Sequence, residues 1–204
     1  SNNELKINDR SYPVGIHGLI HSKSWKKVDH ELNYIESILV SDDHTKMSFP
    51  FDFHIIERLT LIKNKILFEF DITNDSMESM PCDLGLHPFF LIEKFDTSKI
   101  ATNGVRYIDP VDNKLLAAIS DESVLNKGCF VENADYLLVN DIDQNVKLTN
   151  IKGFKHFMIW TGNKDKFMVV EPLTAYLDGI NQKSTGMLID ANKSVNLKFE
   201  IEFN

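Results

Sequence analysis

A histidine and a glutamate occupy the ends of two apolar segments of this sequence. His87 lies in GLHPFF (85–90), between a leucine and a proline, at the end of a run with the pattern of a strand. Glu171 follows the apolar residues of FMVVEP (167–172), and Pro172 after it tends to end a ladder or a helix. An imidazole and a carboxylate fixed in this way are the groups that proton transfer on a neutral substrate requires. The two residues are therefore candidates for acid–base chemistry.

The segments that must position these residues alternate apolar and polar side chains. Residues 195–203 alternate without a break, and residues 66–72 and 47–53 follow the same period, which is typical of half-buried strands. In the last series, Pro50 falls on the other face and favours an edge or a bulge. Stretches with the composition of turns separate the runs: 41–44, 63–65, 74–76, 103–104, 161–165 and 190–192. We predict an all-β, antiparallel sandwich or barrel.

Composition and length indicate one globular domain over residues 1–204. The chain has 204 residues, 43% of them hydrophobic, and no linker or repeat. The best helical stretch, 121–125, is too short to change the fold class.

Charge and cysteine usage exclude several kinds of partner. A net charge of −8 argues against nucleic acid and anionic membranes. No apolar run approaches the roughly 18 residues needed to span a bilayer. Cys82 and Cys129 lie far apart without C-x-x-C spacing, so neither a zinc ribbon nor a disulfide framework is indicated. We expect a cytoplasmic protein with neither nucleic-acid nor membrane partners.

The candidate residues also have structural interpretations. A histidine before a proline is often a satisfied structural residue, and Glu171 has a lysine, Lys166, available as an ion-pair partner. Most aromatic side chains are expected in the core. Four other histidines are predicted to be at the surface or half-buried: His30, His44, His54 and His156.

A metal site is one further interpretation, because His17 and His21 have i,i+4 spacing. That spacing brings two imidazoles together only on a helix. Pro13, Gly15 and Gly18 disfavour a helix there. We therefore predict no metal site.

Four motifs follow one another from about residue 12 to the end of the chain. They are HGLI (17–20) with Trp25, then FPFDF (49–53) leading through LFEFDITN (67–74) to MPCDLGLHPFF (80–90), then 130–138, and finally VEP (170–172) with Asp178 and Asn181. In order and spacing they resemble the aldose 1-epimerase, or galactose mutarotase, family. The resemblance is closer to the bacterial sugar epimerases found near lactose operons.

The resemblance implies a galactose mutarotase-like β-sandwich, or supersandwich, that interconverts the α and β anomers of a free aldohexose such as galactose or glucose. It implies Glu171 as the general base on the C1 hydroxyl and His87 as the general acid on the ring oxygen, with the roles exchanged on ring closure. His17 and Asp135 would bind sugar hydroxyls, and rings such as Phe89 and Trp160 are suited to stacking on the apolar face of the sugar. The reaction needs neither metal nor cofactor.

The sequence departs from the family pattern at its front. Family members usually carry a section before the His-Gly segment that supplies an arginine to the sugar, and this chain begins after it. A fragment and a natural short form are both compatible with the sequence, so we expect an N-terminally shortened sandwich. His21 and Ser22 stand where a second family arginine is usual, and Tyr176 and Leu177 replace the proline of the closing motif.

These departures leave alternative functions open. One is a carbohydrate-binding module of the same fold without efficient turnover. Another is a hexose-6-phosphate 1-epimerase, which would need clustered arginines, whereas Arg10, Arg58 and Arg106 are scattered. An exposed edge in a shortened sheet would favour a homodimer.

Overall fold

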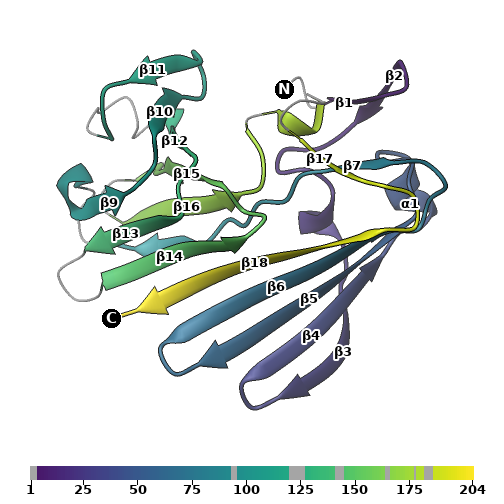
Figure 1. Ribbon diagram of the computed structural model, residues 1–204, viewed down its shortest axis with the longest axis horizontal. Coiled ribbons are helices and arrows are strands. Elements are labelled where there is room, and N and C mark those ends of the chain that lie inside the picture. The colour runs from purple at the N-terminus through teal and green to yellow at the C-terminus, as the bar shows by residue number, and fades with distance from the viewer. Residues whose placement is uncertain are drawn as a thin grey trace.

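The computed structural model describes residues 4–92, 96–119, 127–140, 145–163, 166–176, 178–181 and 186–204. Strands dominate this part of the chain, and the strand pairings within it are antiparallel, which confirms the predicted all-β sandwich (Figure 1). The helical stretch predicted at 121–125 lies outside the described residues. None of the described helices has the length and apolar character needed to cross a bilayer.

A long eight-stranded sheet forms one layer. In spatial order its strands are β3 (Lys26–Glu31), β4 (Tyr34–Val40), β5 (Phe53–Ile62), β6 (Lys65–Asn74), β18 (Ser194–Phe203), β14 (Asn145–Lys152), β13 (Tyr136–Asn140) and β9 (Ile100–Thr102). The predicted turn at 63–65 closes the β5–β6 hairpin, where Lys63 adopts a φ of 57°.

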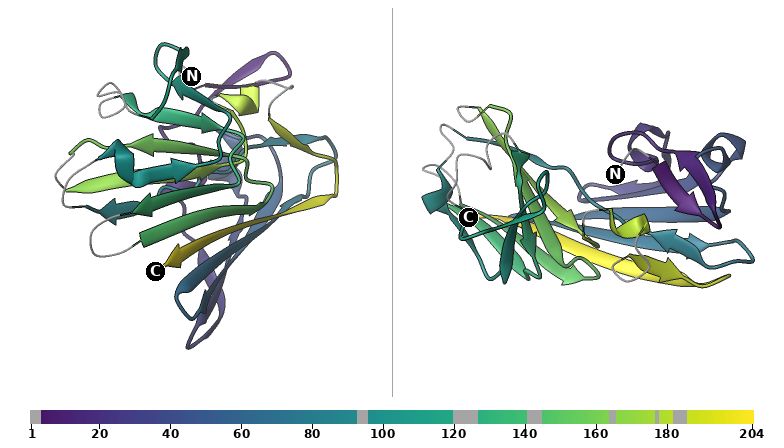
Figure 2. Two further views of the ribbon diagram at one scale, coloured as in Figure 1. Left: turned by 60° about the vertical axis from the view of Figure 1, so that its left-hand side comes forward. Right: turned by 90° about the horizontal axis from the view of Figure 1, so that it is seen from above.

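A six-stranded sheet forms the second layer and carries the site. Its strands, in order, are β11 (Lys114–Leu116), β10 (Arg106–Asp109), β12 (Cys129–Glu132), β15 (His156–Trp160), β16 (Phe167–Leu173) and β8 (Phe89–Leu91). It lies against the β14–β18 part of the long sheet, whereas the β3–β4 and β5–β6 hairpins lie to one side (Figures 1 and 2).

Smaller elements complete the described chain. Two short pairs are β1 (Glu4–Ile7) with β2 (Arg10–Pro13), and β7 (Met80–Cys82) with β17 (Met187–Ile189). The helical turns are α1 (Asp43–Lys46), η1 (Ile20–Ser22), η2 (Thr97–Lys99) and η3 (Gly179–Asn181).

The core lies between the two large sheets. Phe157 of β15 and Phe199 of β18 are fully buried, and their ring centroids are 6.4 Å apart. Phe154 bridges toward Phe70, with centroids 6.5 Å apart. Burying an aromatic or aliphatic side chain of this size contributes about 1.5–3 kcal/mol. Phe70 and Phe199, from the apolar series predicted in 66–72 and 195–203, are thus part of the set that joins the layers.

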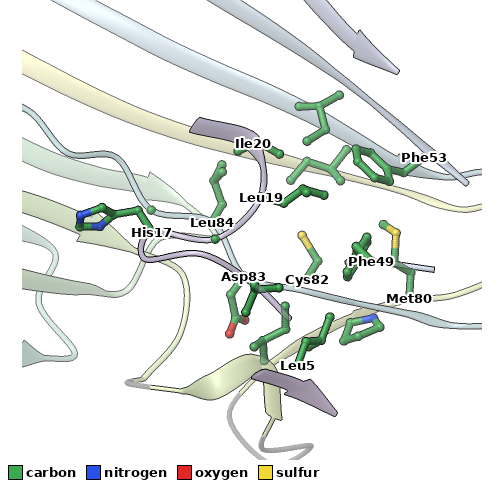
Figure 3. Close-up of a pocket in the computed structure, with 17 residues that line it drawn as sticks. Leu5, His17, Leu19, Ile20, Phe49, Phe53, Met80, Cys82, Asp83 and Leu84 are labelled. Carbon is green, nitrogen blue, oxygen red and sulfur yellow. The ribbon is translucent and has the colours of Figure 1, made fainter. Parts of the chain in front are cut away.

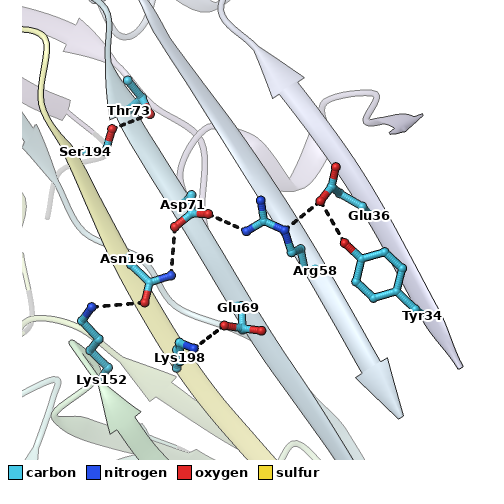
Figure 4. Close-up of polar contacts among 10 residues, drawn as sticks. All are labelled: Tyr34, Glu36, Arg58, Glu69, Asp71, Thr73, Lys152, Ser194, Asn196 and Lys198. Carbon is cyan, nitrogen blue, oxygen red and sulfur yellow. Dashed lines mark hydrogen bonds and ion pairs between the residues drawn. The ribbon is translucent and has the colours of Figure 1, made fainter. Parts of the chain in front are cut away.

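The other face of the long sheet carries a chain of polar contacts (Figure 4). Arg58 donates from Nε to Glu36 at 2.7 Å and from its terminal nitrogen to Asp71. Asn196 donates to Asp71 at 2.9 Å and accepts from Lys152 at 3.2 Å. These contacts occupy the polar positions of the alternating strands.

The predicted strand over 47–53 is wrong, because β5 begins only at Phe53. The preceding residues form turns after α1. Asp42 caps that helix: its carboxylate accepts from the amide of Thr45 at 2.7 Å, and its own amide donates to the Thr45 hydroxyl at 2.8 Å. Pro50 has no amide hydrogen for a ladder. Local capping therefore overrides the alternating pattern.

His156 is buried, contrary to the prediction. Its side chain is on β15, and the residue is 7% exposed. The ring lies 5.1 Å from that of Phe130, and Nδ1 accepts from the amide of Asn133 at 3.2 Å. Burial, with a smaller contribution from the charge of Lys155, lowers the pKa of His156 to about 4. The other three are exposed or half-buried: His30, His44 and His54.

Acid should therefore destabilise the fold through His156. The unfolded imidazole binds a proton below about pH 6.5 and the folded one only near pH 4, so stability present above 6.5 is lost as pH falls toward 4. The loss attributable to this residue is about 3 kcal/mol. We expect urea unfolding at pH 7 and pH 4 to give a smaller difference for His156→Gln than for the wild type. His30→Gln, at an exposed site, is the control that should keep the wild-type difference; equal differences in all three proteins would contradict the assignment.

Candidate active site

The two predicted catalytic residues lie together on the six-stranded sheet. Nε2 of His87 is 3.3 Å from Oε1 of Glu171, and their side chains are 31% and 19% exposed. Glu171 projects from β16, and His87 from the segment that leads into β8. Glu171 makes no ion pair with Lys166, both of which belong to the described chain. The pair is therefore half-buried and open to a ligand.

Backbone register brings the two side chains together. Gly85 forms a bridge with Leu173, and farther along β8 pairs antiparallel with β16, so His87 falls opposite Glu171. A Cβ on Gly85 would lie 2.6 Å from Leu173 Cδ2. Glycine at this place thus permits the close approach that the register needs.

His17 joins the pair from a distant part of the sequence. Its ring meets that of His87 edge to face, with centroids 4.9 Å apart. His17 has a φ of 64° and Gly18 a φ of 78°, so two successive residues are left-handed. Such a conformation is uncommon for a residue other than glycine and is often found at functional sites. Here it directs the imidazole toward His87.

The environment shifts the proton affinities of two of these groups. Burial raises the pKa of Glu171 to about 7. Burial, and then the neighbouring His87 and His21, lower the pKa of His17. A carboxyl group with a pKa near neutrality can both accept and return a proton at neutral pH. A neutral His17 beside His87 keeps a hydrogen-bonding nitrogen without adding a second positive charge.

Asp135 contacts Asn103 and not the His87–Glu171 pair. Its carboxylate accepts from the side chain of Asn103 at 2.9 Å, and its amide donates to the Asn103 side-chain oxygen at 2.9 Å. It directly precedes β13 of the long sheet. None of its described contacts reaches His87 or Glu171.

Aromatic rings extend from the histidine across the sheet. Phe89 is 60% exposed, and its ring centroid lies 5.0 Å from that of His87 and 5.4 Å from that of Phe167. Trp160 lies 5.8 Å from Phe167. The sequence indicated Phe89 and Trp160 as sugar-stacking rings but missed Phe167. Its position four residues before Glu171 on one strand was the available signal, because alternate residues share a face.

A cavity of about 190 Å³ lies beside this site (Figure 3). His17 is at one end of it, and Phe53 and Met80 are at the other. Asp83 is the carboxylate among its lining residues, and burial raises the pKa of Asp83 to about 7. The remaining lining is mostly apolar, so the cavity offers few partners for sugar hydroxyls, whose burial without hydrogen bonds is costly. It is an apolar space behind His17.

The His17 and His21 rings do not form a helical metal pair. Their centroids are 6.1 Å apart, and they belong to a turn and to the 3-10 helix η1. Among the described residues, no group of three or more His, Cys, Asp and Glu side chains has a metal-binding arrangement.

Comparison with known proteins identifies the family. The sequence model described as aldose 1-epimerase matches residues 2–202. The chain belongs to the aldose 1-epimerase family. The closer resemblance to epimerases near lactose operons stays a prediction. Comparison with curated proteins returned no match.

Solved structures share the aldose 1-epimerase fold over the whole chain. The Slr1438 protein of Synechocystis sp. PCC 6803 aligns with a TM-score of 0.87 at 16% identity, covering 100% of this chain and 73% of its own. A galactose mutarotase-like protein of Lactobacillus casei aligns at 0.84 and 18% identity, covering 100% and 81%. A galactose mutarotase related enzyme of Lactobacillus acidophilus aligns at 0.81 and 19%, covering 100% and 78%. At these identities the likeness establishes the fold.

One residue of the closing motif of this chain has a structural role. The side-chain nitrogen of Asn181 donates to Asp178 at 2.8 Å and to the carbonyl of Glu4 at 2.9 Å, and its oxygen accepts from the amide of Lys6 at 2.8 Å. Asn181 thus ties η3 to β1. In the same motif, Glu171 is the residue that faces the site.

The raised proton affinity of Glu171 can be measured directly. In protein labelled with ¹³C at glutamate side chains, we expect the Glu171 carboxyl to titrate at about pH 7, because burial disfavours the ionised form. The resonance of Glu171 is assigned as the one that is absent from the spectrum of the Glu171→Gln variant. Titration of that resonance in the ordinary range of glutamates would contradict the described burial.

Proposed function

We propose that this chain is an isomerase that interconverts the α and β anomers of a free aldohexose, with His87 and Glu171 as its acid–base pair. Membership of the aldose 1-epimerase family supports an epimerase-type activity and a small sugar as the substrate. The observation that carries the finer proposal is the 3.3 Å approach of Nε2 of His87 to Oε1 of Glu171 on a partly open sheet face.

The chemistry matches two proton-transfer groups that lie side by side. Glu171 removes the proton from the C1 hydroxyl while His87 donates a proton to the ring oxygen. The bond between C1 and the ring oxygen breaks, and C1 becomes an aldehyde. After rotation about the bond between C1 and C2, the same proton transfers run in reverse on the other face. The hydroxyl and ring oxygens are both bonded to C1, so adjacent groups reach them together.

Electrostatics supports this division of roles. The pKa of Glu171, raised by burial to about 7, makes its carboxylate a stronger base than an exposed one while a large fraction is still ionised at neutrality. The lowered pKa of His17 keeps that ring neutral beside His87.

His17 is the second binding group of the proposal. Its ring touches the ring of His87, so a sugar held by His87 would be within reach of a hydrogen bond from His17. A role for Asp135 in binding sugar hydroxyls stays a prediction. Its carboxylate would have to exchange its hydrogen bond with Asn103 for one to the sugar.

The alternatives receive less support. A hexose phosphate would require free arginines near the pair, but Arg58 is bound to Glu36 and Asp71 on the other sheet, and Arg106 pairs with Glu132 at 3.1 Å. A binding module would not need an imidazole and a carboxylate side by side, and the approach of His87 to Glu171 therefore favours the isomerase. The homodimer stays a prediction.

Anomer exchange tests the proposed reaction. We expect the chain to accelerate exchange of glucose or galactose anomers, measured by NMR, and Glu171→Gln to reduce kcat by about 10²- to 10⁴-fold, because one proton-transfer group is lost. Sugar affinity, measured by calorimetry, should change far less. Glu31→Gln, on the exposed strand β3, is the matched control and should keep the wild-type rate.

The opposite result would be equally clear. If the folded wild type binds sugar but leaves anomer exchange at the uncatalysed rate, the isomerase proposal is wrong and the binding module remains.

A further inference from the structure

Beside the His87–Glu171 pair lies a set of aromatic rings that proton transfer does not use. We propose that Phe89, Phe167 and Trp160, here called the aromatic platform, bind a second sugar ring, so that reducing disaccharides are preferred substrates over free hexoses. This inference rests on the proposed function, because it places the reducing end of the disaccharide at His87 and Glu171.

The platform is continuous with the catalytic pair. Ring centroids follow one another from His87 to Phe89 at 5.0 Å, from Phe89 to Phe167 at 5.4 Å, and from Phe167 to Trp160 at 5.8 Å. A ligand that leaves the pair along this row therefore passes from one ring to the next without crossing a polar gap.

The strand register puts the platform on the same face as Glu171. Phe167, Val169 and Glu171 are alternate residues of β16 and share one face of the sheet. Phe89 and Trp160 are the neighbours of Val169 on the two flanking strands. Val169 itself is fully buried, although it lies on the face that carries the site.

The spacing places the platform beside the reacting carbon rather than over it. Trp160 pairs with Val169, which is two residues before Glu171 on β16 and so about 7 Å from it along the strand. Phe167 is four residues before Glu171, about 14 Å along the same strand. The first ring of a disaccharide, held at the pair, leaves the second ring over this area. A free hexose would reach only its near edge.

The chemistry of the exposed rings suits a pyranose. Phe89 is 60% exposed, and Leu91, two residues along β8 and on the same face, is 92% exposed. Contiguous exposed apolar surface commonly marks an interaction or ligand site. The face of an aromatic ring carries negative charge density, which attracts the weakly positive C–H groups on the apolar face of a pyranose. Gly162 lies against the platform: a Cβ there would be 3.0 Å from Trp160 Cη2. The indole therefore packs on the backbone at Gly162 as well as against the ring of Phe167.

The orientation of the disaccharide follows from the reaction. Only the reducing ring has a free anomeric hydroxyl, so that ring must occupy His87 and Glu171. The glycosidically linked ring has no proton-transfer step to undergo and is bound only. The expected substrate class is therefore a disaccharide with a free anomeric carbon.

Substitution of Trp160 tests the contribution of the second sugar ring separately from that of the first. Glucose, maltose, cellobiose and lactose present the same reducing residue, so the ratio of kcat/KM for each disaccharide to that for glucose isolates the contribution of the second ring. We expect the highest ratio in the wild type to be about 3- to 10-fold, the size of one aromatic contact. Trp160→Leu should bring this ratio close to one, and Trp160→Phe, which keeps a π face, should retain most of it.

Leu188→Ala is the control for exposed apolar surface in general, because Leu188 is 63% exposed on β17, outside the six-stranded sheet. It should leave the ratio unchanged. Phe89 is not the test position, because its ring contacts His87 and its removal would affect both substrates. Ratios of one or less for all three disaccharides in the wild type, or a ratio that survives Trp160→Leu, would overturn the platform.

A binding measurement keeps the platform testable if catalysis fails. In Glu171→Gln, we expect at least one of the disaccharides to bind about 3- to 10-fold more tightly than glucose and to shift the NMR signal of the Trp160 indole. If the wild type fails to accelerate anomer exchange while this binding preference is intact, the proposed reaction alone is refuted. Equal binding of glucose and all three disaccharides would refute the platform alone.

Discussion

The antiparallel register between residues 85–91 and β16 is the constraint on which the site depends. It sets His87 opposite Glu171 and Phe89 opposite Val169, so one backbone pairing determines both the proton-transfer pair and the neighbouring rings. A slip of one residue would turn every side chain of the segment to the other face of the sheet. Gly85 allows the close approach to Leu173 at the start of this pairing. The core contacts of Phe157 and Phe199 matter to function because they hold the sheet that supplies β16.

Burial acts on the two kinds of titratable group in opposite directions, and the site uses both. It disfavours whichever form is charged, so it raises the pKa of Glu171 and lowers that of His17. A fully exposed glutamate would be a weaker base, and a fully buried one would remain protonated at neutral pH. The half-buried position, 19% exposed for the side chain, lies between these limits. The depth of Glu171 in the sheet thus sets its proton affinity, and the strand register sets its position.

The sequence was sufficient for those features that depend on period and order. Alternation along 66–72 and 195–203 predicted the strands now seen as β6 and β18, because a half-buried strand must alternate. The apolar approach to Glu171 and the Gly-x-His-Pro segment pointed to two polar groups that the structure brings together. Their predicted place at strand ends is wrong, because β16 continues through Pro172 to Leu173 and His87 precedes β8. Their roles in catalysis are not decided by that proximity.

Other features depended on contacts that no local pattern records. The strand predicted at 47–53 failed because Asp42 and Thr45 close a capping box just upstream, and a local hydrogen-bonded turn outweighed the alternation. His156 was misjudged because its burial arises from Phe130 of the adjacent strand and from the Asn133 amide, both of which are distant in sequence. The contact between Asp135 and Asn103 likewise joins residues 32 positions apart.

The partner of Glu171 distinguishes it from the structural carboxylates of the long sheet. Glu36 and Asp71 share Arg58, Glu69 pairs with Lys198, and Glu200 pairs with Lys65. A permanently charged partner would keep Glu171 ionised and lower its proton affinity. Such a partner would also be unable to give up a proton at neutral pH. An imidazole is the one common side chain that can pair with a carboxylate in its charged form and still donate and regain a proton near neutrality. Placing lysine and arginine on the outer face of one sheet, and histidine beside the buried glutamate of the other, separates charges that stabilise the fold from charges that are free to change.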